Sequence, residues 1–150
     1  MKLSNWLLPV VVGLAVFILW WVLEPNQMVD APVITGWVGV TWLVFRAFGS
    51  TFLIPFAEEL AFRGYVMRRL VKRDFETVSY RLVSVWGFLG SSLAFGLLHQ
   101  RWLAGIAAGL AYAFVCYRSG QLRDAVIAHA VTNGLIALAV LGFGKWSFWI

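Results

Sequence analysis

The chain has 150 residues, of which 61% are hydrophobic and only 13% are charged, and its mean hydropathy is +0.82. A soluble domain carries about 25% charged residues, so this composition excludes a water-soluble globule and predicts an integral membrane protein in contact with lipid. The net charge of +5 does not indicate binding to nucleic acid, because most basic residues cluster in residues 68–81 and no polar surface with interleaved aromatic residues accompanies them.

The first predicted membrane helix covers residues 6–23. It ends at Glu24-Pro25, because proline disfavours a helical residue before it. Its apolar run is longer than the core of about 7–15 residues in a cleavable signal, so we expect the helix to be retained in the membrane.

Two further helices are expected over residues 33–48 and 51–71, with a break between them at Gly49-Ser50. The break is predicted because one uninterrupted helix would be too long for a single crossing of the membrane. Basic residues end the second of these helices and mark its cytoplasmic end.

Three more helices are expected over residues 82–99, 102–117 and 124–142. The middle one contains Gly105 and Gly109, a spacing of small residues that lets two helix backbones approach closely. These segments complete the membrane-spanning part of the chain.

The predicted fold class is an all-α polytopic membrane helix bundle with about six transmembrane helices. It would consist of two N-terminal membrane helices in residues 1–50, a four-helix core in residues 51–143 and a tail in residues 144–150. By the positive-inside rule, residues 68–81 face the cytoplasm. Six crossings would then put the N-terminus outside, and five would put it inside.

Residues 55–64 place two carboxylates and an arginine inside an apolar stretch. An ionisable residue at membrane depth costs about 2.5–3.5 kcal/mol on insertion scales, so such a cluster indicates a functional site. Glu59 and Arg63 are four residues apart on one helix face and are expected to pair. Glu58 points about 100° away and is left free to face a cavity, where it can act as a general base.

Two more polar motifs lie in later helices. Phe95 precedes His99 by one helical turn, and His129 precedes Asn133 by one turn. A single membrane histidine more often forms a hydrogen bond between helices, but two histidines, an asparagine and an unpaired glutamate in one small bundle indicate joint catalysis. The chain has no His-Glu-x-x-His helix and no Gly-x-Ser-x-Gly turn, which excludes the usual zinc-protease and serine-hydrolase signatures.

Three motifs on separate predicted helices resemble, in order and in spacing, those of the CPBP family of CAAX-type and bacteriocin-processing (Abi-type) intramembrane proteases. The motifs are Glu58-Glu59-x-x-x-Arg63, Phe95-x-x-x-His99 and His129-x-x-x-Asn133. The resemblance covers about residues 51–142.

The resemblance implies an endopeptidase that cleaves a membrane-associated or lipidated peptide near its C-terminus. Carried over by motif, Glu58 would activate water, and His99 would orient that water or share its proton. His129 and Asn133 would stabilise the oxyanion that forms on the scissile carbonyl. The supporting residues would be Glu59, Arg63 and Phe95.

A zinc-dependent version of the same hydrolysis would use an overlapping set of residues. In that case, His99, His129 and either Glu58 or Glu59 would bind the metal and leave one position open. Asn133 suits an oxyanion hole better than a zinc shell, so we favour hydrolysis without a metal.

Two functions without proteolysis would also suit buried polar residues in a membrane bundle. One is a non-enzymatic membrane partner, such as an immunity or sorting-complex protein. The second is a proton-linked transporter, in which buried carboxylates and histidines are natural. Neither function explains why the three motifs occur together.

Counting from the helix ends places Glu58, His99 and His129 at different depths in the membrane. We nevertheless expect their side chains to converge, which requires helices that are tilted, offset or short. The partners implied are membrane lipids and a membrane-associated peptide, with no nucleic acid.

Two short runs, residues 101–105 and 145–149, resemble a narrower bacterial subgroup that is related to CAAX proteases and found beside exosortase sorting systems. This resemblance implies a bacterial inner membrane and partners in a membrane sorting complex.

Overall fold

The computed structural model describes residues 4–24, 29–30, 32–33 and 35–149, and the regular structure in these residues is entirely helical. The α-helices are α1 (Ser4–Val22), α2 (Gly36–Phe48), α3 (Ile54–Glu59), α4 (Met67–Arg69), α5 (Val85–Leu97), α6 (Trp102–Ser119) and α7 (Leu122–Phe143). Short 3-10 turns follow at Phe75–Thr77, Tyr80–Leu82 and Trp146–Trp149. The all-α fold class predicted from the sequence is confirmed.

The helices α2, α3 and α4 are parts of one continuous helix, Gly36–Arg69, which is 34 residues long. The predicted break at Gly49-Ser50 is therefore wrong, and the described residues form five long helices instead of six. Gly49 keeps right-handed helical angles of φ −60° and ψ −48°, and the Ser50 hydroxyl donates a hydrogen bond to the Ala47 carbonyl within the same helix. Glycine permits a break but does not impose one. The predicted division of the chain at residues 50 and 143 stays a prediction.

Two π-helical segments, Gly49–Leu53 and Leu60–Val66, flank α3. The first of them accommodates Pro55, which has no N–H to donate. The N–H of Ile54 donates to the carbonyl of Gly49, five residues earlier. In the same register the carbonyl of Ser50 would accept from residue 55, where the proline has no hydrogen. That carbonyl is therefore available to a side chain from another helix.

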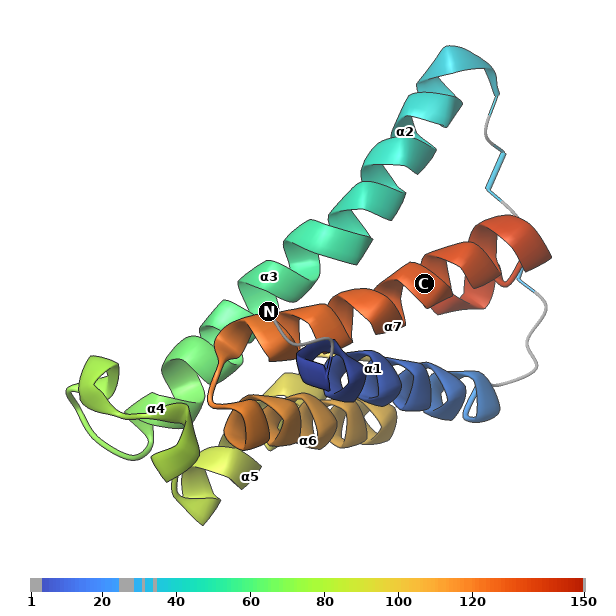
Figure 1. The fold of residues 1–150 in the computed structure, drawn as a ribbon. Coiled ribbons are helices and arrows are strands. Elements are labelled where there is room, and N and C mark those ends of the chain that lie inside the picture. Colours follow the sequence, from blue (N-terminus) through green and yellow to red (C-terminus); the bar gives the residue numbers. More distant parts are fainter. Residues whose placement is uncertain (1–3, 25–28, 31, 34, 150) are drawn as a thin grey trace.

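The other long helices pack into a bundle in which α1 contacts α6 and α7, and α5 lies along α6 (Figure 1). Glycines allow the close contact between α5 and α6. A Cβ atom on Gly105 would lie 3.0 Å from the Cα of Gly96, and one on Gly109 would lie 2.9 Å from the carbonyl oxygen of Ser92. The predicted close approach of the helix that contains Gly105 and Gly109 is confirmed, with α5 as its partner.

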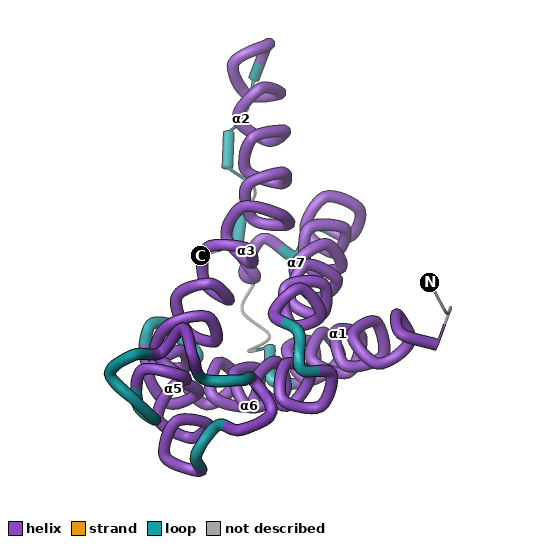
Figure 2. Tube along the Cα trace, turned by 60° about the vertical axis from the view of Figure 1, so that its left-hand side comes forward, coloured by secondary structure: helices purple, strands orange, loops and turns teal. Residues whose placement is uncertain are grey.

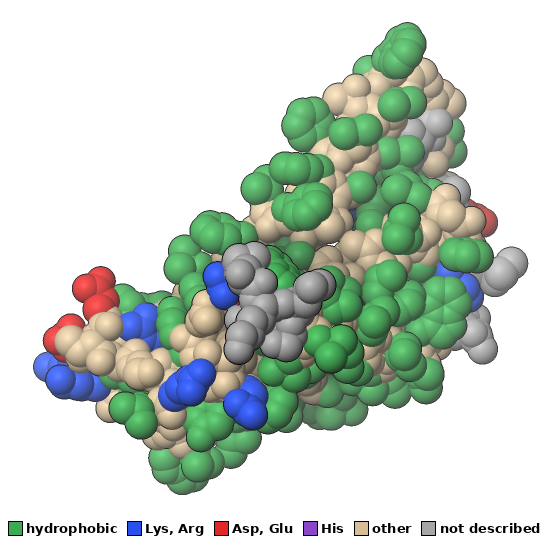
Figure 3. Space-filling view, in the orientation of Figure 1, with side chains coloured by type: hydrophobic (Ala, Val, Ile, Leu, Met, Phe, Trp, Pro, Cys, Tyr) green, Lys and Arg blue, Asp and Glu red, His purple; other side chains and the backbone are tan. Residues whose placement is uncertain are grey.

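The α2 part of the long helix projects away from the bundle, as Figures 1 and 2 show from two directions. Only 6% of the most apolar window of Gly36–Arg69 is buried. Gly36–Arg69 and Leu122–Phe143 are the two described helices that are long and apolar enough to cross a membrane. On the face seen in Figure 3, hydrophobic side chains cover most of the surface, and charged side chains gather mainly around α4 and the loop after it.

The two ends of the bundle are joined by different polar contacts. At the α4 end, Arg81 donates a hydrogen bond to the carbonyl of Ser119, which ties the loop after α4 to the turn between α6 and α7. At the opposite end, Arg101 forms an ion pair with Glu24, which ties the start of α6 to the residues after α1. The two contacts therefore anchor the two ends of α6.

Candidate active site

One cavity of about 300 Å³ brings the four predicted catalytic side chains together. These residues are Glu58, His99, His129 and Asn133. Counting along the helices predicted that these residues lie at different depths. They meet because the long helix crosses α7 at an angle (Figure 1) and because α5 has only 13 residues. The rest of the wall is mainly aromatic and aliphatic, with Trp20, Ile54, Phe95, Tyr112 and Ile136 among its residues.

Beside the cavity, Glu59 and Arg63 form an ion pair in which neither side chain is exposed. Nη1 of Arg63 lies 3.2 Å from Oε1 of Glu59, as the spacing of four residues predicts. Nη2 of Arg63 donates to the carbonyl oxygen of Gly109 at 2.7 Å, and its guanidinium lies 4.5 Å from the ring centre of Phe95. Since a buried charge without a partner is strongly destabilising, these contacts fix the long helix against α6.

His129 lies between the two glutamates. Its Nδ1 is 3.0 Å from Oε1 of Glu59, and its Nε2 is 3.8 Å from Oε2 of Glu58. Because a carboxylate only accepts, the hydrogen bond to Glu59 places a proton on Nδ1 and turns Nε2 toward Glu58. The imidazole also stacks on the ring of Tyr112, with 4.6 Å between the centroids and 16° between the planes. These contacts hold the ring in one orientation.

Glu58 is the carboxylate that faces the cavity, and its side chain is 28% exposed. Its Oε2 is buried and has no hydrogen-bond partner among the described residues. With both glutamates ionised and Arg63 charged, the cluster carries one net negative charge.

His99 follows the last residues of α5 and presents one ring nitrogen to the cavity. Its Nδ1 lies 2.9 Å from the carbonyl oxygen of Phe95, so Nδ1 is the nitrogen that donates. In the neutral ring, Nε2 is then an acceptor. The edge of the ring packs against Trp20, with 6.1 Å between the centroids.

Asn133 links α7 to the first π-helical segment. Its Nδ2 donates to the carbonyl of Ser50 at 2.9 Å. This carbonyl is the one left without a helical partner by Pro55. The amide retains a second N–H, so Asn133 can hold the long helix and still donate to a group in the cavity.

Sequence reasoning did not identify Tyr112, Trp20 or Arg46 as lining residues of this cavity. Nothing in the pattern of α6 distinguishes Tyr112 from a core residue. Arg46 carried a signal, because an arginine in an apolar helix needs a partner. Its partner is the carbonyl oxygen of Trp149, 2.8 Å from Nη2. Trp149 lies in the segment that was predicted to be a separate tail.

The side chains that would bind zinc lie close together but are not arranged to hold a metal ion. Among the described residues, no group of three histidine, cysteine, aspartate or glutamate side chains is arranged to hold a metal. The zinc set of His99 and His129 with Glu58 or Glu59 therefore does not fit this geometry.

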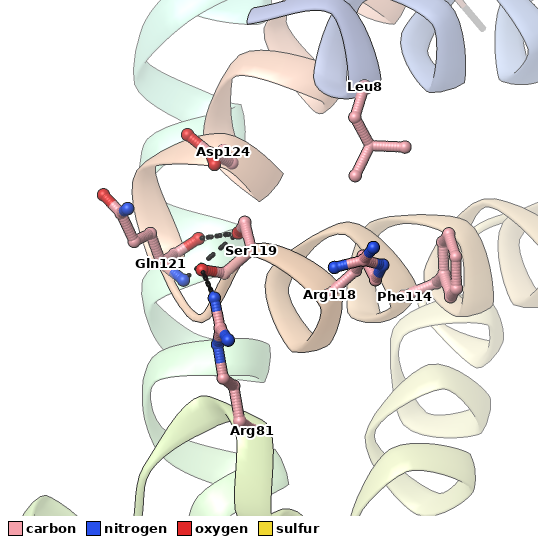
Figure 4. Close-up of a pocket in the computed structure, with 7 residues that line it drawn as sticks. All are labelled: Leu8, Arg81, Phe114, Arg118, Ser119, Gln121 and Asp124. Atoms are coloured by element: carbon pink, nitrogen blue, oxygen red, sulfur yellow. Dashed lines mark hydrogen bonds between the residues drawn. The ribbon is translucent and has the colours of Figure 1, made fainter. Parts of the chain in front are cut away.

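A second cavity, of about 550 Å³, lies at the α4 end of the bundle (Figure 4). Arg81, Arg118 and Gln121 line it, and Arg81 donates to the carbonyl of Ser119. It contains none of the predicted site residues. We therefore place the candidate chemistry in the first cavity.

Residues 40–135 match a protein family described as type II CAAX prenyl endopeptidase Rce1-like. The match covers well over half of the chain and includes all three motifs quoted above. Neither the curated proteins nor the solved structures compared with the chain contain a match. On the strength of the family match, the chain belongs to the Rce1-like family of type II CAAX prenyl endopeptidases.

Proposed function

We propose that the chain is an intramembrane endopeptidase that cleaves a membrane-associated or lipidated peptide near its C-terminus, with Glu58 as the base that activates water. The family supports a protease with a peptide substrate. The observation that carries the assignment of roles is the single cavity lined by Glu58, His99, His129 and Asn133. The carboxylate of Glu58, which lines this cavity and is 28% exposed, is the acceptor that a water molecule needs there.

In the proposed reaction, Glu58 takes a proton from water as the water oxygen bonds to the carbonyl carbon of the scissile peptide. Nε2 of His99 accepts a hydrogen bond from the same water and orients it. The C–N bond then breaks, and the proton held by Glu58 passes to the leaving nitrogen. One water and one peptide bond thus give a carboxylic acid and an amine.

His129 and Asn133 are proposed to stabilise the oxyanion. Asn133 donates its remaining N–H. His129 would donate from Nε2 in its doubly protonated form, in which Nδ1 keeps its hydrogen bond to Glu59. Loss of one such donor typically lowers kcat by about 10²–10³-fold.

The basic residues give the proposed orientation in the membrane. Arg68, Arg81 and Arg118 lie toward the end of the bundle where α4 meets the α6–α7 turn, and this end is assigned to the cytoplasm. With five helices crossing the membrane, α1 begins on the cytoplasmic side, and the ion pair of Glu24 and Arg101 lies outside.

The cell membrane of a bacterium remains the expected location, on the resemblance of residues 101–105 and 145–149 to the exosortase-associated subgroup. Lipids and a sorting complex remain the expected partners on the same basis. The apolar wall of the cavity supports a hydrophobic peptide as the substrate.

The test is a comparison of peptide termini in membranes of cells that express the wild type, Glu58→Gln or Glu76→Gln. Glu76 is an exposed glutamate outside the cavity and serves as the matched control. We expect a new peptide terminus with the wild type and with Glu76→Gln that is lost with Glu58→Gln. Identical termini in all three samples would favour a non-enzymatic membrane partner.

A further inference from the structure

The segment Trp146–Trp149, called here the return segment, folds back over the cavity after α7 ends. Gly144 has φ of +65°, a left-handed conformation that suits glycine and reverses the chain. Phe148 and Trp149 then line the same cavity as Glu58 and His99. The return segment is therefore a stretch of peptide that already lies at the candidate active site.

Two arginines, Arg46 in α2 and Arg101 just before α6, hold the return segment by its backbone. Nη2 of Arg46 donates to the carbonyl oxygen of Trp149 at 2.8 Å, and Nη2 of Arg101 donates to that of Ser147 at 3.2 Å. Among the described residues, Arg46 has no acidic partner, and its guanidinium donates to peptide backbone instead.

Aromatic rings hold the side chains of the return segment. Phe148 lies 5.8 Å from Trp21, and Trp149 lies 6.4 Å from Trp42, between ring centroids. The guanidinium of Arg101 lies 5.6 Å from the ring centre of Phe148, and that of Arg46 lies 5.6 Å from that of Trp149. Phe148 and Trp149 thus each meet an arginine and an aromatic ring.

We propose that Arg46 and Arg101, with the rings of Trp21 and Trp42, form a subsite that binds apolar, aromatic peptide by its backbone carbonyls, and that the return segment occupies this subsite until a substrate peptide displaces it. The proposal rests on the proposed function for the identity of the displacing ligand. In this subsite the two arginines bind the peptide backbone, and the two rings prefer large aromatic side chains.

The contacts suit exchange between one peptide and another. Every peptide offers carbonyl oxygens, so the arginine hydrogen bonds do not depend on the sequence of the occupant, whereas the rings select aromatic residues. An occupant on the same chain competes at a high effective concentration. The apparent affinity for substrate is therefore lower in proportion to the fraction of molecules in which the subsite is free.

The test measures how accessible the return segment is. Ser147→Cys is introduced into the full chain with Cys116→Ala, and the rate of reaction with a maleimide is followed in lipid nanodiscs. The hydrogen bond to Ser147 uses its backbone oxygen, so the substitution leaves that bond in place. Gln121→Cys, at an exposed position on the α6–α7 turn, gives the rate for a freely accessible thiol.

We expect Ser147→Cys to react at least 10-fold more slowly than Gln121→Cys, and to approach that rate when Arg46→Gln and Arg101→Gln are added. Arg81→Gln is the matched control, because Arg81 also donates to a backbone carbonyl but lies at the opposite end of the bundle. It should leave the rate unchanged. Rapid labelling of Ser147→Cys without the arginine substitutions would overturn the proposal.

Displacement is tested with the peptide acetyl-Lys-Trp-Ser-Phe-Trp-amide, added to the Ser147→Cys protein that also carries Glu58→Gln. We expect the labelling rate to rise to a plateau with this peptide and to stay constant with one in which serine replaces the aromatic residues. No response to the aromatic peptide would overturn the subsite.

Because Glu58→Gln removes the proposed base, this displacement assay does not depend on cleavage. Saturable displacement without any cleaved product in cells would contradict the proposed function and leave the subsite standing. Cleavage in cells without displacement would support the proposed function and contradict the subsite.

Discussion

Nδ1 of His129 lies 3.0 Å from Oε1 of Glu59, a contact between two residues that are 70 positions apart in the chain. The same oxygen also accepts from Nη1 of Arg63. Glu59 therefore has two roles, which the sequence motif alone does not separate. It balances a buried cation, and it sets the orientation of the imidazole that faces Glu58.

The ion pair of Glu59 and Arg63 is expected to show strong coupling in a double-mutant cycle. Arg63→Met leaves the carboxylate of Glu59 without its cation and should lower the free energy of unfolding by about 3–5 kcal/mol. Adding Glu59→Gln removes the stranded charge, so the double variant should be more stable than Arg63→Met alone. Unfolding in mixed detergent micelles measures the stability of each variant. A double variant that loses as much as Arg63→Met alone, or as much as the two single variants added together, would contradict the coupling.

Asn133→Ala is expected to affect both stability and catalysis. It leaves the carbonyl of Ser50 without a hydrogen bond, which should cost about 1–3 kcal/mol. It also removes a proposed oxyanion donor, which should lower kcat by about 10²–10³-fold with little change in KM. Steady-state kinetics on the peptide found by terminal analysis measures this effect. An unchanged kcat would limit Asn133 to a structural role.

Gly109→Ala is expected to separate α5 from α6. The added Cβ would lie 2.9 Å from the carbonyl oxygen of Ser92, and it would also displace the Gly109 carbonyl that accepts from Arg63. Overpacking of this kind costs about 1–3 kcal/mol. Gly142→Ala is the matched control, because its Cβ would meet no atom within 4 Å. Since alanine is the better helix former, that variant should be as stable as the wild type or slightly more stable. Equal losses for the two variants would argue against a specific α5–α6 contact.

Proteolysis is expected to persist after removal of metal ions. The reason is the arrangement of the donors, since no three of them in the described part of the chain are placed to hold a metal. Purified protein would be treated with a zinc chelator, its metal content measured, and its activity assayed before and after zinc is restored. Activity that is lost with zinc and returns on its addition would restore the zinc-dependent mechanism.

Thr132→Val is expected to weaken the contact between α1 and α7. The Thr132 hydroxyl lies 2.9 Å from the carbonyl oxygen of Gly13 and 3.1 Å from that of Ala128. Valine has nearly the same shape but no donor, so the expected loss is about 1 kcal/mol in the free energy of unfolding. A loss much larger than this would indicate a wider rearrangement of the two helices.

The sequence by itself determined the features that depend on composition and on spacing within one helix. The scarcity of charged residues predicted a helical membrane protein, and the spacing of four residues predicted the pair of Glu59 and Arg63. The motifs also singled out the four side chains that meet in the cavity. The pair and the spacing within each motif could be predicted because the geometry of an α-helix relates residues three or four positions apart whatever surrounds them. The membrane prediction needed only the composition.

Only the tertiary structure decided how the helices meet. The continuity of Gly36–Arg69, the contact of Glu59 with His129 and the return of residues 146–149 over the cavity depend on crossing angles and on the register between helices. The bond from Asn133 to Ser50 depends further on a π-helical turn that leaves one carbonyl free. Spacing along the chain carries no information on these relations, because each is set by the packing of side chains from segments distant in sequence.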